Sequence, residues 1–449
     1  MCGIAGFSAI KQPTIHVEAI LGSLDHRGPD DRGTWTDGLV SLFHTRLSII
    51  DLSTAARQPF GDATGRYVLI YNGEIYNYRE LRETIPYNWT TSSDTEVLLA
   101  ALIRHGEKAL SMLEGMFAFA FFDKETREMI IARDRLGKKP LYYTADENAL
   151  SFASEVRTLL KINGKPGVIS RQNLSNWLFL QSIPGEETLV NSVKRVLPGE
   201  YLKVKDNRIT ERKRFWDPSD CIAGNEFEGK PTKDTLKTLV TEAISKRLES
   251  DVPLACFLSG GVDSSIITAV ASQQVSGKLA TFHLAFREEG YSEHSMARLV
   301  AERYKTDHHE CFLESNELLD ALPDALSACD HPSGDGLNTY VLSKKVQEFG
   351  FKATLSGLGA DEWFVGYSYF RDFEKWRKLS FLSPLLNAVN PLPFRARKVR
   401  EIMNGTRAQQ RGREDARRHL PEGRNRVHSD CSASSGIRGP SNTNSDFRP

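Results

Sequence analysis

The chain has 449 residues, of which 26% are charged and 40% hydrophobic, and its formal net charge is zero. This length exceeds that of one ordinary domain of about 100–200 residues, so we expect two domains. Because positive and negative charges balance, no overall field draws the chain to nucleic acid or to an anionic membrane, and we expect neither as a partner.

Residues 1–205 predict an α+β domain. Short β-like segments such as GIAGFSA (3–9) and MFAFAFFD (116–123) are separated by Gly, Pro and Asp. The clearest helix is DTEVLLAALIRHG (94–106), whose apolar residues fall on one face and which Asp94 can cap. We expect sheet-on-sheet packing in this domain.

A second domain is expected at residues 234–405, after a polar linker at 206–233 that is rich in Lys and Glu. Buried-strand segments alternate there with helices, for example VPLACFLS (252–259) and then IITAVASQQV (266–275). This alternation predicts a parallel α/β sheet, whose ligand would lie at the carboxyl ends of the strands.

Residues 411–449 predict a disordered tail. Arg, Ser, Gly, Asn and Asp dominate this segment, and Lys is absent from it. A segment with so few large apolar residues cannot bury enough surface to offset the entropy lost on ordering.

The six cysteines are scattered without CxxC pairs, which argues against a zinc site and fits free thiols in a reducing compartment. No apolar run approaches the roughly 20 residues needed to span a bilayer, and the N-terminus lacks a secretory signal. We therefore expect a cytoplasmic protein.

Cys2, directly behind the initiator Met1, can become the first residue of the mature protein. Its α-amino group, with an ordinary pKa of about 7.7–8.0, could then take the proton of its own thiol. The alternative is a small buried cysteine near a strand. A thiolate that attacks a carboxamide also needs an oxyanion hole, and Asn72 and Gly73 in YNGEIYN can supply a side-chain amide and a backbone N–H.

An amino-acid substrate would need partners for its charged groups. Arg46 offers a planar fork for an α-carboxylate, and Glu74 with Asp94 could hold the α-ammonium. Each residue alone also has a structural interpretation: Arg46 as a surface charge, Asp94 as a helix cap, and the Asn72–Gly73 pair as a hairpin turn.

Together, motifs along residues 1–205 closely resemble the glutaminase domain of class II glutamine amidotransferases, in the form attached to glutamine-dependent asparagine synthetases. The motifs are MCGIAGF, HRGPDDRG, TRLSIIDL, YNGEIYNYRELR, SSDTEVLL, GMFAFAFFD, RDRLGKKPLYY and FASEVRTLL. The resemblance implies a four-layer N-terminal-nucleophile fold, with Cys2 as the nucleophile and Asn72 and Gly73 as its catalytic partners. The implied glutamine-binding residues are Arg46, Leu47, Ser48, Ile49, Ile50, Asn72, Gly73, Glu74 and Asp94.

LSGGVDSS (258–265) places a Gly-rich turn between a buried strand and a helix, where backbone N–H groups can bind phosphate. It resembles the pyrophosphate-binding loop of the ATP-pyrophosphatase ligases. The resemblance implies ATP and Mg²⁺, with no prosthetic group, and assigns the metal to Asp263 and Asp361. The implied ATP-binding residues are Leu258, Ser259, Gly260, Gly261, Asp263, Ser264, Leu284, Ser356 and Gly357.

The resemblance thus implies a glutamine-hydrolysing asparagine synthetase that uses glutamine, ATP and aspartate. Two departures leave alternatives open. Relatives carry an acidic third residue in a motif resembling SGEGADE, whereas this chain has Leu358, which favours another carboxylate as the acceptor. The chain also lacks the family's downstream lysine and helices, as a truncated or frame-shifted copy would, and such a copy could retain only glutaminase activity. Whether the protein forms a homodimer is left open.

Overall fold

The computed structural model describes residues 1–10, 16–220, 232–286, 294–331, 333 and 336–379. The chain forms two compact units, Met1–Leu358 and Gly359–Pro449, and each is described by itself. The predicted tail at 411–449 lies outside the described residues, as does the end of the predicted second domain at 380–405.

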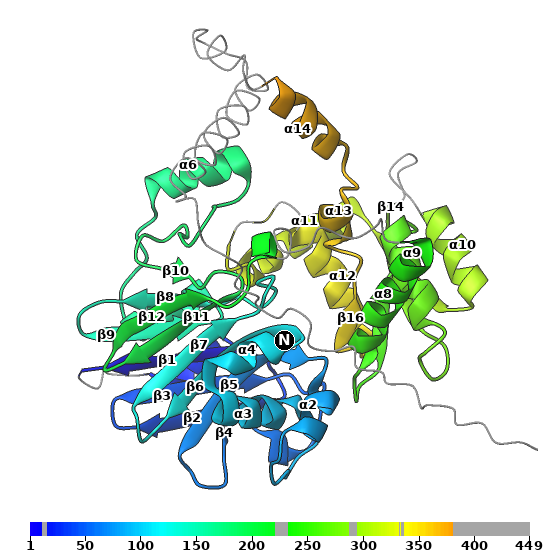
Figure 1. The fold of residues 1–449 in the computed structure, drawn as a ribbon. Coiled ribbons are helices and arrows are strands. Elements are labelled where there is room, and N and C mark those ends of the chain that lie inside the picture. The colour runs from blue at the N-terminus through cyan, green and yellow to red at the C-terminus, as the bar shows by residue number, and fades with distance from the viewer. Residues whose placement is uncertain (11–15, 221–231, 287–293, 332, 334–335, 380–449) are drawn as a thin grey trace, which may run out of the picture. The chain divides into compact units, whose positions relative to one another are not determined.

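The N-terminal part of the first unit contains two antiparallel six-stranded sheets (Figure 1). In spatial order, the first sheet consists of β10 (Lys194–Arg195), β8 (Tyr142–Ala145), β9 (Ala149–Ala153), β1 (Gly3–Ala9), β3 (Val40–Arg46) and β2 (Asp31–Asp37). The second consists of β12 (Arg208–Arg214), β11 (Glu200–Lys205), β7 (Glu128–Arg133), β6 (Gly115–Asp123), β5 (Tyr67–Ile75) and β4 (Phe60–Gly61). The helices of this part are α1 (Val17–Gly22), α2 (Tyr78–Thr84), α3 (Asp94–His105), α4 (Ala109–Met112), α5 (Val156–Asn163) and α6 (Arg171–Leu180), with 3-10 turns at Thr54–Ala56 and Gly106–Lys108.

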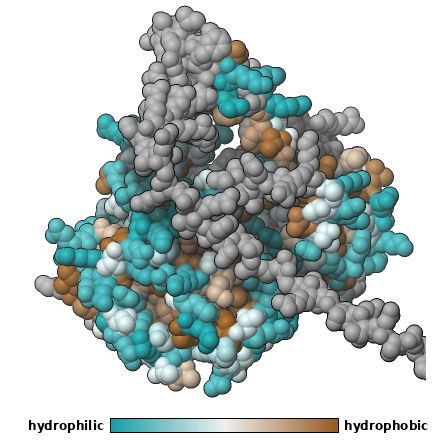
Figure 2. Space-filling view, in the orientation of Figure 1, coloured by the Kyte–Doolittle hydropathy of each residue, from teal (hydrophilic) through white to brown (hydrophobic). Residues whose placement is uncertain are grey.

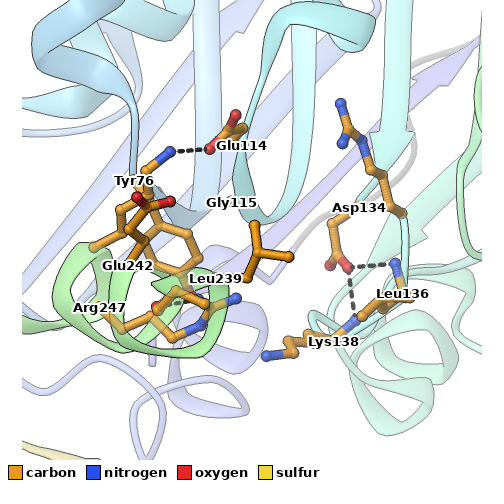
Figure 3. A pocket seen from close by; sticks show the side chains of 12 residues that line it. Tyr76, Glu114, Gly115, Asp134, Leu136, Lys138, Leu239, Glu242 and Arg247 are labelled. Atoms are coloured by element: carbon orange, nitrogen blue, oxygen red, sulfur yellow. Dashed lines mark hydrogen bonds and ion pairs between the residues drawn. The ribbon is translucent and has the colours of Figure 1, made fainter. Parts of the chain in front are cut away.

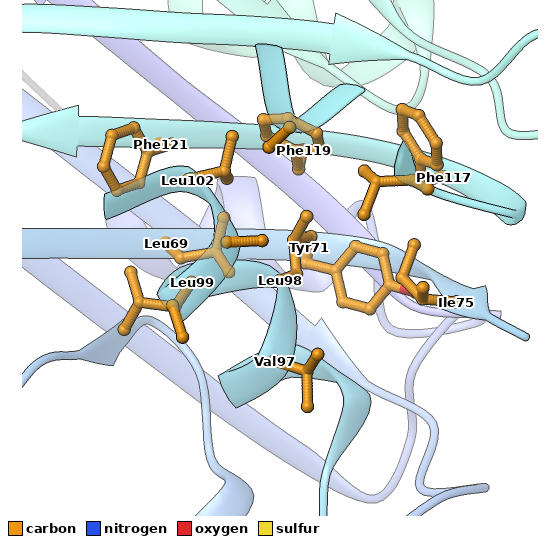
Figure 4. Packing of buried hydrophobic residues seen from close by; sticks show 14 of the residues in the cluster. Leu69, Tyr71, Ile75, Val97, Leu98, Leu99, Leu102, Phe117, Phe119 and Phe121 are labelled. Atoms are coloured by element: carbon orange, nitrogen blue, oxygen red, sulfur yellow. The ribbon is translucent and has the colours of Figure 1, made fainter. Parts of the chain in front are cut away.

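Alternating side chains give the second sheet two buried faces. Leu69 and Tyr71 of β5 pack with Phe119 of β6 against α3 (Figure 4), whereas Val68 and Ile70 point to the opposite face and pack against the first sheet. Because successive residues of a strand point to opposite faces, an apolar run of this kind fits a sheet covered on both sides.

The first sheet is likewise covered on its outer face, where Phe7 and Phe43 pack with Ile20 of α1 and Leu159 of α5. The order of layers is therefore helices, sheet, sheet, helices. This confirms the predicted α+β domain with sheet-on-sheet, four-layer packing.

Helix α3 begins at the predicted residue but is capped differently. Ser93 occupies the N-cap position, and its hydroxyl accepts a hydrogen bond from the backbone N–H of Thr95. The interpretation of Asp94 as the N-cap residue is therefore wrong, and its carboxylate is free for the contacts described below.

The later part of the first unit is built on a four-stranded parallel sheet. Its strands, in spatial order, are β15 (Asp307–Leu313), β14 (Ala280–Phe286), β13 (Leu254–Phe257) and β16 (Ala353–Leu355). Its helices are α8 (Lys233–Ser245), α9 (Val262–Ala271), α10 (His294–Tyr304), α11 (Ser315–Ala328) and α12 (Gly336–Glu348), with a 3-10 turn at Lys246–Leu248. The predicted parallel α/β architecture is confirmed, and the strand order reverses between β13 and β16, where such sheets bind ligands.

The stretch expected as a linker, residues 206–233, contains a strand. β12 (Arg208–Arg214) pairs with β11 and extends the second antiparallel sheet, and residues 221–231 lie outside the described part. Within the second unit, the described helices are α13 (Ala360–Phe364) and α14 (Ser368–Lys378).

On the face shown in Figure 2, hydrophilic residues cover much of the described part, with hydrophobic residues scattered among them. Among the described residues, no helix has the length and apolar character needed to cross a membrane.

Candidate active sites

Cys2 lies immediately before β1, half-buried, with its sulfur facing the loop that follows β3. The backbone N–H of Leu47 donates to Cys2 Sγ at 3.4 Å. The backbone carbonyl of Cys2 accepts a hydrogen bond of 3.1 Å from Nε of Arg27. The thiol is thus held beside the segment from Leu47 to Ile50, which was predicted to bind glutamine and which is itself half-buried.

The N-terminal amino group lies in the same surroundings. Burial lowers the pKa of the Met1 α-amino group to about 5; the charge of Cys2 opposes this shift, and Lys139 and Arg27 add to it. An amine in this environment stays neutral near pH 7 and can accept a proton. When Met1 is removed, Cys2 carries the α-amino group of the chain.

Asn72 and Gly73 lie within β5, opposite Ala118 and Phe117 of β6, so their interpretation as a hairpin turn is wrong. Asn72 is 1% exposed, and its Nδ2 donates to no acceptor among the described residues. A Cβ atom at Gly73 would lie 2.2 Å from the carbonyl oxygen of Met116, so only glycine fits there. A buried amide donor without a partner suits a developing oxyanion.

Glu74 follows directly and has a counter-charge that the sequence interpretation missed. Burial raises the pKa of Glu74 to about 7, opposed by Lys139 and reinforced by Asp94. Lys139 is 5% exposed; burial lowers its pKa, and the charges of Glu74 and Cys2 oppose the shift. The signal for Lys139 was its place in the motif RDRLGKKPLYY, which carries the resemblance without identifying a role for it.

Arg46 is buried rather than a surface charge. Its guanidinium donates to the backbone carbonyls of Ser53, at 2.9 Å, and Asp51, which fixes the loop after β3. These two carbonyls occupy only part of the five N–H donors of a guanidinium, so the fork can still bind a carboxylate.

Asp94 is buried beneath β5. Its Oδ2 accepts hydrogen bonds from the hydroxyl of Tyr71 at 2.8 Å and from the backbone N–H of Ile75 at 3.0 Å. Burial raises its pKa, although these hydrogen bonds oppose the shift. Asp94 thus holds the strand that carries Asn72 and Glu74.

Arg27 and Glu155 form a further part of this site that the sequence interpretation did not single out. Arg27 Nη1 donates to Glu155 Oε1 at 3.0 Å, and His26 Nε2 lies 2.7 Å from the same oxygen. Glu155 is 3% exposed, so this carboxylate is a buried anchor for the cation that contacts the backbone of Cys2. Both residues lie in motifs that carry the resemblance, HRGPDDRG and FASEVRTLL.

The second candidate site is the turn between β13 and α9. Gly260 has a φ of +85°, and Gly261 is the N-cap of α9 and provides no side-chain cap. The start of a helix presents backbone N–H groups that can bind an anion. The hydroxyls of Ser259 and Ser264 lie 3.0 Å apart and brace the turn, and Asp263 is in the first helical turn. This arrangement fits a phosphate group with a cation.

The turn after β16 reaches the same place. A Cβ at Gly357 would lie 3.0 Å from Cβ of Asp263 and 3.1 Å from the backbone nitrogen of Ser264, so the two predicted ATP-binding segments are in contact. Ser356 precedes this glycine. Leu258 is buried at the end of β13, and Leu284 is half-buried in β14.

The remaining predicted residues lie near the boundary between the units. Leu358 is 80% exposed at the end of the first unit. Asp361 lies in the first turn of α13, in the second unit.

A cavity of about 340 Å³ lies between the N-terminal part of the first unit (residues 1–205, here called the glutaminase-like part) and the segment Leu239–Arg247 (Figure 3). The guanidinium of Arg247 lies 4.7 Å above the ring of Tyr76. Burial raises the pKa of Tyr76, and the charge of Glu74 adds to the shift. Tyr76, which directly follows the end of β5, forms part of the wall of this cavity.

Comparison with known proteins gives two family matches. Residues 1–216 match a glutamine amidotransferase domain, and residues 235–441 match asparagine synthase. The chain is 34% identical over 384 residues to asparagine synthetase (glutamine-hydrolysing) 1 of Bacillus subtilis, an alignment that covers 83% of this chain and 60% of the relative. It is 31% identical over 407 residues to amidase chry2 of Gibberella zeae, covering 83% of this chain and 60% of that protein.

A third relative is covered more fully. The putative asparagine synthetase (glutamine-hydrolysing) 2 of Methanocaldococcus jannaschii is 32% identical over 393 residues, which cover 82% of this chain and 76% of the relative. The chain thus spans about 60% of the length of the first relative and about three quarters of this one. By both domain matches and this relative, the chain belongs to the family of glutamine-hydrolysing asparagine synthetases.

Proposed function

We propose that this chain is a glutamine-dependent asparagine synthetase of the cytoplasm. The observation that carries the proposal is the 3.4 Å contact between Cys2 Sγ and the backbone nitrogen of Leu47. It brings the nucleophile to the segment after Arg46, where a glutamine side chain would enter.

The first half-reaction follows from the groups around Cys2. The α-amino group of the mature Cys2 takes the thiol proton, and the thiolate attacks the carboxamide carbon of glutamine. Asn72 and Gly73 donate hydrogen bonds to the oxyanion of the tetrahedral intermediate. The carboxamide nitrogen then takes the proton from the α-amino group of Cys2, and the intermediate collapses to a thioester with release of ammonia. Water then hydrolyses the thioester to glutamate, while Arg46 and Glu74 hold the α-carboxylate and the α-ammonium.

The second half-reaction belongs to the turn between β13 and α9. Backbone N–H groups at the start of α9 bind the phosphates of ATP, and Ser259 and Ser264 shape the turn. The carboxylate of aspartate attacks the α-phosphorus and releases pyrophosphate. Ammonia then attacks the acyl carbon and AMP leaves, which gives asparagine.

Asp263 and Asp361 would hold Mg²⁺. A bound Mg²⁺ offsets the negative charge that builds on the pyrophosphate. The proposal rests on the chemistry of the two carboxylates and, for Asp263, on its place in the first turn of α9.

A second candidate is amide transfer to another carboxylate. The exposed Leu358, at a position where the resemblance implies an acidic residue, favours it because leucine can neither accept a proton nor orient ammonia. A relative named amidase aligns over a similar length. The third candidate retains glutamine hydrolysis alone.

One assay separates the three. Purified protein receives glutamine, ATP with Mg²⁺ and aspartate, and glutamate, AMP and asparagine are measured. Glutamate together with aspartate-dependent AMP and asparagine supports the main proposal, and glutamate alone supports the third candidate. Product with another carboxylate but not with aspartate supports the second. A Cys2→Ala variant that still hydrolysed glutamine would refute the nucleophile.

A further inference from the structure

Two helices of the first unit, far apart in sequence, cap each other. Helix α5 has Glu155 at its N-cap, but this side chain makes no cap hydrogen bond to its own helix. The first helical N–H groups instead donate to Asp330, from Val156 to Oδ2 at 2.5 Å and from Arg157 to Oδ1 at 3.1 Å. A carboxylate at this position satisfies orphan donors and is favoured by the helix dipole.

The reciprocal cap comes from Arg157. Its Nη1 and Nη2 donate to the carbonyls of Ser327 and Ala328, at 2.6 Å and 3.0 Å, in the last turn of α11. Its Nε lies 3.4 Å from Asp330 Oδ1 and 2.8 Å from Glu155 Oε2. The guanidinium is therefore shared between the end of α11 and the carboxylate of Glu155.

A ring contact lies beside this pair of caps. The ring of His331 stands edge-on to that of Tyr142 in β8, with centroids 5.2 Å apart, and the two side chains are hydrogen-bonded. The segment after α11 is thus docked on the glutaminase-like part of the chain by several contacts at once.

Glu155 links these caps to the nucleophile. It is the carboxylate partner of Arg27, whose Nε donates to the backbone carbonyl of Cys2. Because Asp330 caps α5, the carboxylate of Glu155 is not needed as a cap and can bind Arg27. Because the end of α11 and Asp330 also hold the guanidinium of Arg157, Arg157 competes less with Arg27 for Glu155.

We propose that Asp330, in the synthetase half, is a positioning residue for glutamine hydrolysis, which acts through Arg157, Glu155 and Arg27 on the backbone of Cys2. When Asp330 is absent, the start of α5 loses its cap and Arg157 is drawn to Glu155. Arg27 is then held less firmly and the thiol is displaced from its reactive position. This inference rests on the proposed glutaminase function and adds a dependence of that site on the other half of the chain.

The test compares Asp330→Ala and Asp330→Asn in the full chain. The asparagine can still accept one of the two N–H bonds, so it should rescue part of the activity. We expect kcat for glutamine hydrolysis to fall roughly 10- to 100-fold in the alanine variant and less in the asparagine variant, with KM for glutamine little changed. Asp324→Ala is the matched control, since Asp324 lies in α11, shortly before Asp330 in the chain, is exposed and forms an ion pair with Lys344 at 3.4 Å.

A second readout needs no glutamine. Alkylation of Cys2 by iodoacetamide, followed at the Cys2 peptide by mass spectrometry, should slow roughly threefold in Asp330→Ala because Arg27 no longer fixes the backbone of Cys2 and the thiol leaves its position beside Leu47. Thermal unfolding is measured in parallel to verify that each variant is folded at the assay temperature.

Rates of hydrolysis and alkylation that stay within about twofold of the wild type in a folded Asp330→Ala protein would overturn the inference. The same holds if Asp324→Ala lowers kcat as strongly. If the wild type itself does not cleave glutamine, the proposed function fails, whereas the alkylation rates still decide whether Asp330 acts on Cys2.

Discussion

The hydroxyl of Tyr71 donates a hydrogen bond of 2.8 Å to the buried carboxylate of Asp94 and so ties β5 to the start of α3. Asp94 keeps its second bond, from Ile75, when Tyr71 is replaced by phenylalanine. Tyr71→Phe should therefore lower the free energy of unfolding by about 1–3 kcal/mol, the cost of a buried acceptor that loses one partner. Urea unfolding measures the change.

Tyr143→Phe is the control for this variant. Tyr143 is buried in β8, and no protein acceptor for its hydroxyl is found among the described residues. A loss as large as that of Tyr71→Phe would contradict the role assigned to the Asp94 contact.

Glu74 should give glutamine binding a pH dependence. Its pKa of about 7, raised chiefly by burial, means that it is largely protonated at pH 6 and ionised at pH 8. Only the ionised form attracts the substrate ammonium, so KM for glutamine should fall as the pH rises through 7. In Glu74→Gln, KM should be higher and nearly independent of pH over this range, and steady-state kinetics at several pH values test this. A wild-type KM that is flat from pH 6 to 8 would refute the role of Glu74.

The sequence predicted the architecture because periodicity is local. The continuous apolar run of β5 and the Gly turn after β13 are complete within a few residues. β12 was missed because RITERKR is an edge strand, and the charges that suit an edge also suggest a linker. Lys139 and Glu155 were missed because their roles depend on partners far away in the chain, such as Arg27, 128 residues from Glu155. Local sequence patterns do not indicate which distant residues will lie side by side in the folded chain.

His44 should make the domain sensitive to acid. It is 1% exposed in β3, and burial lowers its pKa to about 3, which the hydrogen bond to the carbonyl of Tyr71 only partly offsets. In the unfolded chain it titrates near 6.5, so the unfolded state binds more protons between these values and stability falls as the pH drops from about 6.5 to 3. His44→Gln, which cannot titrate but can still donate to Tyr71, should flatten this part of the profile. Urea unfolding at pH 5.0 and 7.5 shows whether the difference shrinks in the variant, and an unchanged difference would exclude His44 as its source.

Leu98 tests the layer between α3 and the second sheet (Figure 4). It is fully buried among residues of β5 and β6. Leu98→Ala removes apolar contacts and leaves a cavity, so the free energy of unfolding should fall by about 2–5 kcal/mol. Leu52→Ala, at a position that is 53% exposed, should change it by less than about 0.5 kcal/mol. Chemical denaturation of both variants compares them, and equal losses would place Leu98 outside the core.

A substitution at Gly357 should affect only the second of the two proposed half-reactions. A methyl group there would meet Asp263 and Ser264 at 3.0–3.1 Å, so the turn after β13 must shift by a few tenths of an ångström. In the proposed second half-reaction this turn positions the phosphates of ATP, so Gly357→Ala should lower the rate of aspartate-dependent AMP formation roughly 10- to 100-fold. Hydrolysis of glutamine should continue, since Cys2, Asn72 and Glu74 lie on other elements. Ala271→Ser is the control, because it makes a small change at the end of α9 away from the turn. Gly350→Ala does not serve, because the backbone of Gly350 has a φ of +87°, which strains any side chain. If Gly357→Ala formed AMP at the wild-type rate, the turn after β16 would not be part of the nucleotide site.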